Sequence, residues 1–365
     1  MKEHSKISVY QLAALLILTR LFSETMNFTG NAGEYSMQRF AVIVVTYCIL
    51  AVATLPAFFV MKKARDAGIK DGFFRIIMSK NKVWGWILFA LVAFQLSLWA
   101  LYGVSGLEFM VTNTILESAE PALVILLFMI AAIYGFSKGI NAVARFGPPM
   151  FAAYLIGLVT VCIALFHQMD FTLLYPTLIE NDSFFSDICA EIIKNNEMLI
   201  FLILEPRIDK HPWRTPFVTL PITLVIKLVI SAVTMTVFGP YLNKLSFPLF
   251  SIASLADIVV FERLDGIDIA IWTVSAIVKL ILVLICIREF GEMLVGIRKA
   301  KIIAYGVAIV IGVSAVVNNL SGHKLLSFDF TVESLIFSSF VMVILPLVAF
   351  VIVHHNIKQK KICKE

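Results

Sequence analysis

Charged and polar side chains interrupt two apolar segments of this 365-residue chain, and their types suit ligand binding. The first such segment carries Arg20 and, just after it, the run Phe22, Ser23, Glu24 and Thr25. A charge in hydrocarbon costs about 2.5–3.5 kcal/mol on insertion scales, so these groups are expected to face protein or water. We interpret the pattern as a helix interrupted near 22–25, with freed backbone groups lining a cavity. The alternative is an internal pair between Arg20 and Glu24, four residues apart, near the outer interface.

The second interruption lies in the segment 188–206. Asn196 and Glu197 precede an apolar run that contains Phe201. If the span began only at Met198, about eight apolar residues would remain, which is too few to cross a bilayer. The sequence therefore predicts a broken helix, with Asn196, Glu197 and Phe201 at a binding site.

Three further segments contribute candidates for the same pocket. Tyr102 is placed to close it, although packing at an interface would explain this residue equally well. Trp272, Ser275 and Lys279 fall on one helical face, at spacings of three and four residues. Lys279, and more weakly Lys227, are candidates to bind an anionic group or a carboxylate of an ion pathway. The alternative for both lysines is a structural or snorkelled amine.

The sequence favours no covalent chemistry. The chain has no phosphate-binding loop and no HExxH. Its five cysteines contain no CxxC, and its six histidines show no metal-ligand spacing. The sequence predicts no catalytic residue, no cofactor and no metal site, and hence a protein that is not an enzyme.

The composition places these residues in a membrane. The chain is 60% hydrophobic and only 15% charged, with a mean hydropathy of +0.91, whereas soluble domains carry about 25% charge. A span needs roughly 20 apolar residues. We expect ten spans, at about 9–28, 40–61, 84–109, 121–136, 151–168, 188–206, 216–238, 267–286, 302–320 and 335–354.

The basic residues give the orientation, because most of the 30 lysines and arginines fall on alternate loops. Loops rich in Lys and Arg stay cytoplasmic, so both termini are expected inside. The net charge of +5 then reflects loops beside anionic lipid, not a nucleic-acid surface. The stretch 247–261 is expected to be an outer amphipathic helix and not an eleventh span.

One transmembrane domain, 1–365, accounts for the whole chain. The two interrupted spans head two blocks of five, about 7–168 and 184–355. Five is odd, so the second block is inverted relative to the first, as in transporters whose ligand lies at broken helices. Half-helix ends suit the carboxylate and ammonium groups of an amino acid.

Five short stretches carry a family resemblance over nearly the whole length. They are KISVYQL at 6–12 with LTR at 18–20, SKGINAVAR at 137–145, MDFTLLYP at 169–176, and FERLD at 261–265 followed by Ile271, Trp272 and Lys279. Their order and spacing resemble the B subunit of nutrient germinant receptors of endospore-forming bacteria, the GerAB-type spore germination permeases. Many members have a Gly-Thr-Gly-like break in the first span, where this chain has FSET at 22–25. An acidic residue there is expected to favour an amine-bearing ligand or to couple to an ion.

The resemblance implies an all-α fold of the amino acid–polyamine–organocation superfamily, a LeuT-like inverted repeat of five plus five helices. It further implies a subunit that senses germinants such as amino acids in the spore inner membrane. Its partners would be an A-type subunit and a C-type lipoprotein. An ion-coupled amino-acid transporter of the same fold is the main alternative, and a scaffold with a vestigial pocket is the third.

Overall fold

The computed structural model describes residues 6–25, 38–66, 72, 74–75, 82–114, 119–174, 184–193, 197–245, 247–256, 265–322, 344 and 347–351. Within these residues the secondary structure is helical, apart from an isolated bridge between Ile7 and Ile208. Seven of the described helices are long and apolar enough to cross a membrane. The chain is therefore an all-helical, multi-pass membrane protein.

The seven long helices follow the hydropathy of the sequence closely. They are α2 (Gln38–Asp66), α4 (Lys82–Thr114), α5 (Pro121–Lys138), α6 (Ile140–Leu165), α9 (Arg214–Phe238), α11 (Asp265–Val295) and α12 (Ile297–Leu320). The shorter helices are α1 (Val9–Thr25), α7 (Phe184–Ile193), α8 (Glu197–Leu204) and α10 (Pro248–Leu255). Short 3₁₀ turns complete them: η2 (Phe166–Gln168), η3 (Phe171–Leu174), η4 (Glu205–Arg207) and η5 (Gly239–Lys244).

The two expected interruptions lie at the edges of the described residues. The backbone of α1 is helical through Thr25, and residues 26–37 lie outside the described residues, so the interruption predicted near 22–25 stays a prediction. No glycine or proline stands there to stop the helix. In the expected sixth span, α7 ends at Ile193 and α8 begins at Glu197. The predicted break falls between them and stays a prediction. Residues 194–196 themselves, and most of the expected tenth span, lie outside the described residues.

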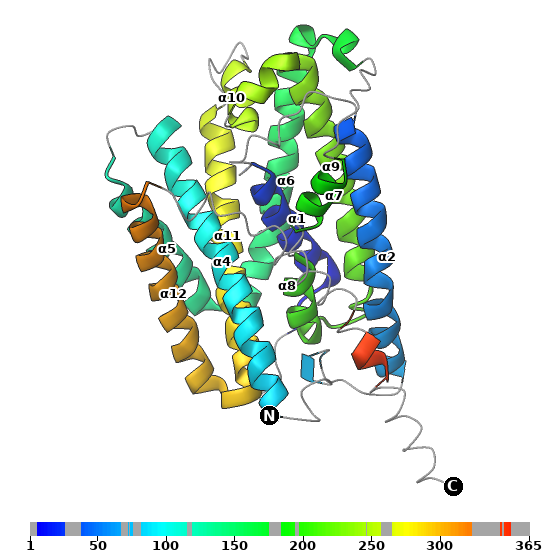
Figure 1. Cartoon of the computed structure of the whole chain (residues 1–365), viewed down its shortest axis with the longest axis vertical. Helices are drawn as coiled ribbons and strands as arrows, with labels where there is room; N and C mark the ends of the chain where they lie inside the picture. Colours follow the sequence, from blue (N-terminus) through cyan, green and yellow to red (C-terminus); the bar gives the residue numbers. More distant parts are fainter. Residues whose placement is uncertain are drawn as a thin grey trace.

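The stretch after α9 forms the short helix α10, at the upper end of the bundle in Figure 1. At eight residues and a rise of 1.5 Å each, α10 is about 12 Å long. It is too short to span a bilayer, in agreement with an external helix at this point.

The centre of the bundle is α1 (Figure 1). Every residue from Leu12 to Phe22 is buried, and α11 is buried in the same way from Val278 to Ile287. In Figure 1, α2 lies on one flank of α1, and α4, α5 and α12 lie on the other. The flanking helices carry the exposed leucines, isoleucines and valines that a lipid-facing surface requires.

Two glycines make the sharpest connections. Gly139 alone separates α5 from α6, and Gly296 alone separates α11 from α12. Their φ angles are 80° and 83°, a left-handed conformation that side chains disfavour. A Cβ atom at either position would meet nothing within 4 Å, so backbone conformation and not space requires glycine.

The lower end of the bundle is closed by contacts with the segment that follows α8. Ile7 donates its backbone N–H to the carbonyl of Arg207 at 2.9 Å, and Lys6 Nζ lies 2.9 Å from Asp209 Oδ1. The hydrogen bond and charge of Lys6 lower the pKa of the Asp209 carboxyl below its ordinary value. Arg207 Nε also donates to Glu289 Oε2 at 2.9 Å, which fixes η4 to α11.

Candidate functional site

The helix α1 presents two functional faces. Successive residues turn by about 100°, so Arg20 and Phe22 point to opposite sides of the helix. Arg20 faces α7 and α9, where it meets Glu191 and, through it, Lys227. Phe22 faces α4 and α11, where it meets Trp272. The residues that the sequence assigned to one pocket therefore occupy two neighbouring places.

The first place is a buried charge cluster formed by three helices. Arg20 donates an N–H from its NH2 nitrogen to Glu191 Oε1, and Lys227 donates from Nζ to the same oxygen. Arg20, Glu191 and Lys227 are 2%, 8% and 4% exposed. Burying these charges is costly, and their mutual attraction offsets that cost only when the groups are well paired. The cluster therefore fixes the relative positions of α1, α7 and α9.

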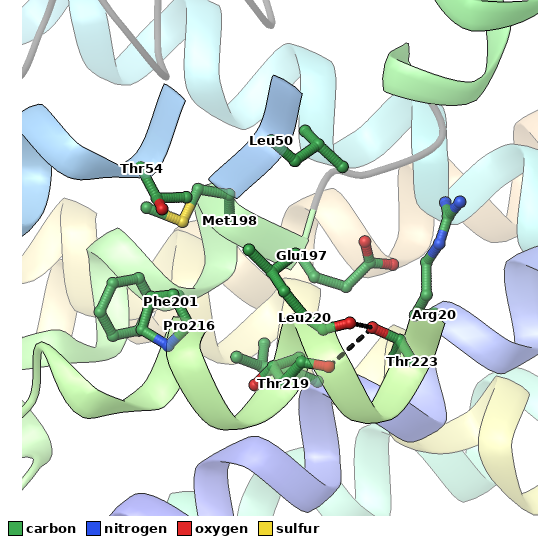
Figure 2. Close-up of a pocket in the computed structure, with 11 residues that line it drawn as sticks. Arg20, Leu50, Thr54, Glu197, Met198, Phe201, Pro216, Thr219, Leu220 and Thr223 are labelled. Atoms are coloured by element: carbon green, nitrogen blue, oxygen red, sulfur yellow. Dashed lines mark hydrogen bonds between the residues drawn. The ribbon is translucent and has the colours of Figure 1, made fainter. Parts of the chain in front are cut away.

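A cavity of about 40 Å³ lies against this cluster. Figure 2 shows the Glu197 side chain extending into it toward the side occupied by Arg20. Glu197 is the first residue of α8 and is 6% exposed. The apolar part of the wall comes from α1, α2, α8 and α9, through Leu16, Leu50, Met198, Phe201, Pro216 and Leu220. A guanidinium and a carboxylate thus meet at one small, mostly apolar space.

Three threonines supply the remaining polar lining. Thr54, Thr219 and Thr223 donate their hydroxyl hydrogens to backbone carbonyls one turn earlier, at 2.7–2.9 Å. With its hydrogen used in this way, each hydroxyl offers the cavity only oxygen lone pairs. Together with Glu197, these oxygens favour a ligand that donates hydrogen bonds, such as an ammonium group.

The second place is an aromatic cluster on the other face of α1. The ring centroids of Phe22 and Trp272 are 5.3 Å apart. Lys279 Nζ lies 5.6 Å from the centroid of Phe22 and 5.4 Å from that of Trp99. An ammonium at these distances is attracted by the faces of the rings. The associated cavity is only about 10 Å³, so in this conformation the cluster is closely packed.

The remaining candidates have the following positions. Tyr102 packs against the aromatic cluster, and its ring centroid is 6.5 Å from that of Trp99. Ser275 is buried in α11 and donates to the carbonyl of Ile271 at 2.9 Å. The side chains of Ser23, Glu24 and Thr25, and the whole of Asn196, lie outside the described residues.

Sequence reasoning missed several of the residues that make the first place. Glu191, Thr54, Thr219, Thr223 and, in the second place, Trp99 were not among the candidates. The sequence does indicate the threonines of α9, because Thr215, Thr219 and Thr223 recur every four residues and lie on one helical face. Glu191 is a charge within the expected span 188–206, but nothing in the local pattern pairs it with Arg20, and nothing distinguishes Trp99 from its neighbours.

The chain is similar to the crystal structure of the manganese transporter of Eremococcus coleocola in complex with an aromatic bis-isothiourea substituted compound. The TM-score is 0.57 at 13% identity, over 95% of this chain and 78% of that chain. A crystal structure of a mutant of the same transporter gives 0.56 at 12% identity, with the same coverage. At such identities the likeness shows the fold alone.

The family follows from the sequence. The family model described as spore germination protein, the spore permease family, matches residues 6–322. The chain belongs to that family. None of the curated protein sequences matches it.

Proposed function

We propose that this protein is the nutrient-sensing membrane subunit of a spore germinant receptor. A small nutrient with the groups of an amino acid binds in the cavity between α1, α2, α8 and α9 and thereby triggers germination. Membership of the spore germination family supports the role in germination. The observation that carries the choice of ligand is that Arg20 and Glu197 face one cavity.

The ligand chemistry follows from that pair. Arg20 lines the cavity, and its guanidinium is a cation with five N–H donors. In the proposed complex the ligand carboxylate pairs with Arg20, and the ligand ammonium pairs with Glu197 and the threonine oxygens. The apolar wall, which includes Phe201, receives the side chain of the nutrient.

The volume of the cavity indicates how sensing works. One water requires about 10–15 Å³ measured in this way, so about 40 Å³ holds only a few waters. A whole amino acid requires the surrounding helices to move apart. A ligand that binds the wider state better than the closed one shifts the equilibrium toward it. Partner subunits of the A and C types would respond to that shift.

The topology belongs to the same proposal. Ten spans in two inverted blocks, about 7–168 and 184–355, would bring the first and sixth helices together at mid-membrane. The contact of α1 with α8 supports this arrangement. The subunit would lie in the spore inner membrane, with both termini on the side of the basic loops.

An ion-coupled amino-acid transporter is the second candidate, and the fold likeness to a manganese transporter favours it. A divalent cation suits this cavity poorly, because the cation Arg20 lines it and a second cation, Lys227, pairs with the same carboxylate as Arg20. A zwitterionic solute fits either role. The two roles differ only in whether the bound solute crosses the membrane.

Two measurements separate the candidates. The purified protein in vesicles is tested for uptake of a labelled panel of amino acids, which a sensor does not carry at transporter rates. In spores, Glu197→Gln is compared with Glu120→Gln, which changes an exposed carboxylate at the N-cap position of α5. Loss of a charge-assisted hydrogen bond worth about 1.5–3 kcal/mol raises the half-maximal nutrient concentration about 10- to 150-fold in the first variant only. Equal dose responses would exclude Glu197 from the site.

A further inference from the structure

The helices α5, α11 and α12 meet near their lower ends at a surface rich in positive charge. The ring centroids of Phe136 and Tyr305 are 5.1 Å apart, which joins α5 to α12. Arg288 Cζ of α11 lies 5.8 Å from the centroid of Phe136, and Lys301 Nζ of α12 lies 5.8 Å from that of Tyr305. In Figure 1, α12 lies beside α5, and α11 joins α12 at the lower end of the bundle. We call this surface, together with Arg298, the basic corner.

The charges around the basic corner are unbalanced. At this end the described residues of α5, α11 and α12 carry five cations, namely Lys138, Arg288, Arg298, Lys299 and Lys301. They carry two carboxylates, Glu289 and Glu292. Glu289 accepts hydrogen bonds from Arg288 and from Arg207 of η4, so two arginines share its one negative charge. The surface therefore has a net positive charge, and an anion complements it.

Arg288 is the point at which the buried part of α11 reaches the surface. Between Val278 and Gly291 every other residue is buried, whereas the Arg288 side chain is 18% exposed. On α12, Arg298 and Lys301 are exposed and three residues apart, so they are neighbours on one side of the helix. A guanidinium is planar and presents parallel N–H donors that match two oxygens of a phosphate, and an ammonium adds a point charge. The chemistry of the corner therefore suits a phosphate group.

Neighbouring contacts place the basic corner at the depth of lipid headgroups. A Cβ atom on Gly291 would lie 3.4 Å from the Cβ of Ala300 and 3.5 Å from the ring of Phe89, so α4, α11 and α12 are level at these residues. Lys301 follows Ala300 directly. The ring of Trp86 is 6.1 Å from that of Phe89, and Trp86 is 46% exposed. Because exposed tryptophans of membrane-spanning helices lie at the headgroup level, Lys301 lies at that level too.

The lipid-facing sides of α5 and α12 are apolar from the basic corner toward the middle of the membrane. Exposed side chains there include Leu126, Leu127 and Ile130 on α5, and Ile302, Ile309 and Val310 on α12. Neither helix carries a charged residue between this end and its upper end. Acyl chains lie against such a surface. A phospholipid therefore matches both the charges and the apolar side chains next to them, whereas a free anion or an acidic protein would match the charges alone.

We propose that the basic corner binds an anionic phospholipid, with the phosphate at Arg298 and Lys301 and the acyl chains along α5 and α12. Arg288 adds positive charge behind them. Each cation near the membrane surface strengthens the binding of an anionic lipid about fivefold. A zwitterionic phospholipid carries the same phosphate with a compensating ammonium group, and therefore binds more weakly. The bound lipid joins α5 to the pair formed by α11 and α12.

The test measures binding of phosphatidylglycerol that carries a fluorophore on an acyl chain, by anisotropy, to the full-length protein in detergent micelles. Unlabelled phosphatidylglycerol is expected to displace it at lower concentration than phosphatidylcholine, and inorganic phosphate no better than chloride of equal ionic strength. Lys301→Gln and Arg298→Gln should each weaken binding about fivefold. The matched control is Lys62→Gln on α2, on the other flank of the bundle, an exposed lysine whose Nζ is 6.0 Å from the ring of Phe58. This variant should bind as the wild type does.

Each other outcome overturns the proposal. Equal displacement by the two unlabelled lipids would mean that the headgroup is not recognised. Displacement by inorganic phosphate beyond the effect of chloride would assign the corner to a free anion. An equal loss in Lys62→Gln would mean that only overall charge matters. Unchanged binding in both Lys301→Gln and Arg298→Gln would remove the lipid from this corner and leave the charges to an acidic protein partner. The inference is independent of the nutrient-sensing role, since no step uses the cavity.

Discussion

The three members of the charge cluster of α1, α7 and α9 are expected to contribute unequally to the unfolding free energy. The wild type has two cations on one carboxylate, Arg20 and Lys227 on Glu191. Glu191→Gln leaves two buried positive charges without their shared anion, a change expected to cost about 3–5 kcal/mol of unfolding free energy. Lys227→Met leaves a one-to-one pair and removes one charge-assisted hydrogen bond, worth at most about 1.5–3 kcal/mol. The carboxylate variant should therefore be the less stable by about 2 kcal/mol.

The double variant Glu191→Gln, Lys227→Met tests whether the two single effects are coupled. It removes one of the two cations that share Glu191, so its cost should fall short of the sum of the single costs by about 0.5–3 kcal/mol. Unfolding of the full-length protein in mixed micelles, titrated with a denaturing detergent and followed by tryptophan fluorescence, measures all three variants. Additive costs, or a smaller loss for Glu191→Gln than for Lys227→Met, would refute the reasoning from charge balance.

Three further predictions use the same unfolding assay. Phe22→Ala removes a ring that is 2% exposed and packed on Trp272. The variant should lose about 3–5 kcal/mol of unfolding free energy. A loss below about 1 kcal/mol would mean that the neighbouring side chains collapse into the void. Gly72→Ala places a Cβ atom into the ring of Pro206, a rigid neighbour, and should cost about 1–3 kcal/mol. Asp209→Asn should be less stable than the wild type at neutral pH, because the salt bridge to Lys6 lowers the pKa of this carboxyl in the folded state. That difference must shrink as the pH falls through the lowered pKa, below the ordinary value of about 3.9, and a difference independent of pH would contradict it.

Hydropathy predicted the helices well because lipid imposes a length and a composition on each one. The start of α5 at Pro121 and the end of α9 at Phe238 agree with the sequence to the residue. Proline at the first helical position and glycine just after the last one make these ends readable. No such residue stands at 22–25 in α1, so the break predicted there came from local polarity alone.

The candidate site could be predicted only in part, for a reason of distance along the chain. The sequence offered Glu24, four residues away, as a partner for Arg20, whereas the described bond goes to Glu191, 171 residues away. Pairs within one helix follow from spacing, but pairs between helices depend on how the bundle packs. For the same reason the pattern could not show that Arg20 and Phe22 serve two different places.

The bond between Arg20 and Glu191 also sets an order of events during synthesis. At about 5–20 residues per second, the 171 residues between them take roughly 9–34 s to make. Throughout that interval the first helix carries a guanidinium whose carboxylate does not yet exist. The contacts of Lys6 and Ile7 form later still, because Ile208 and Asp209 are translated after Glu191. The contacts that fix the amino-terminal helix against α7 can therefore form only after the sixth predicted span has been translated.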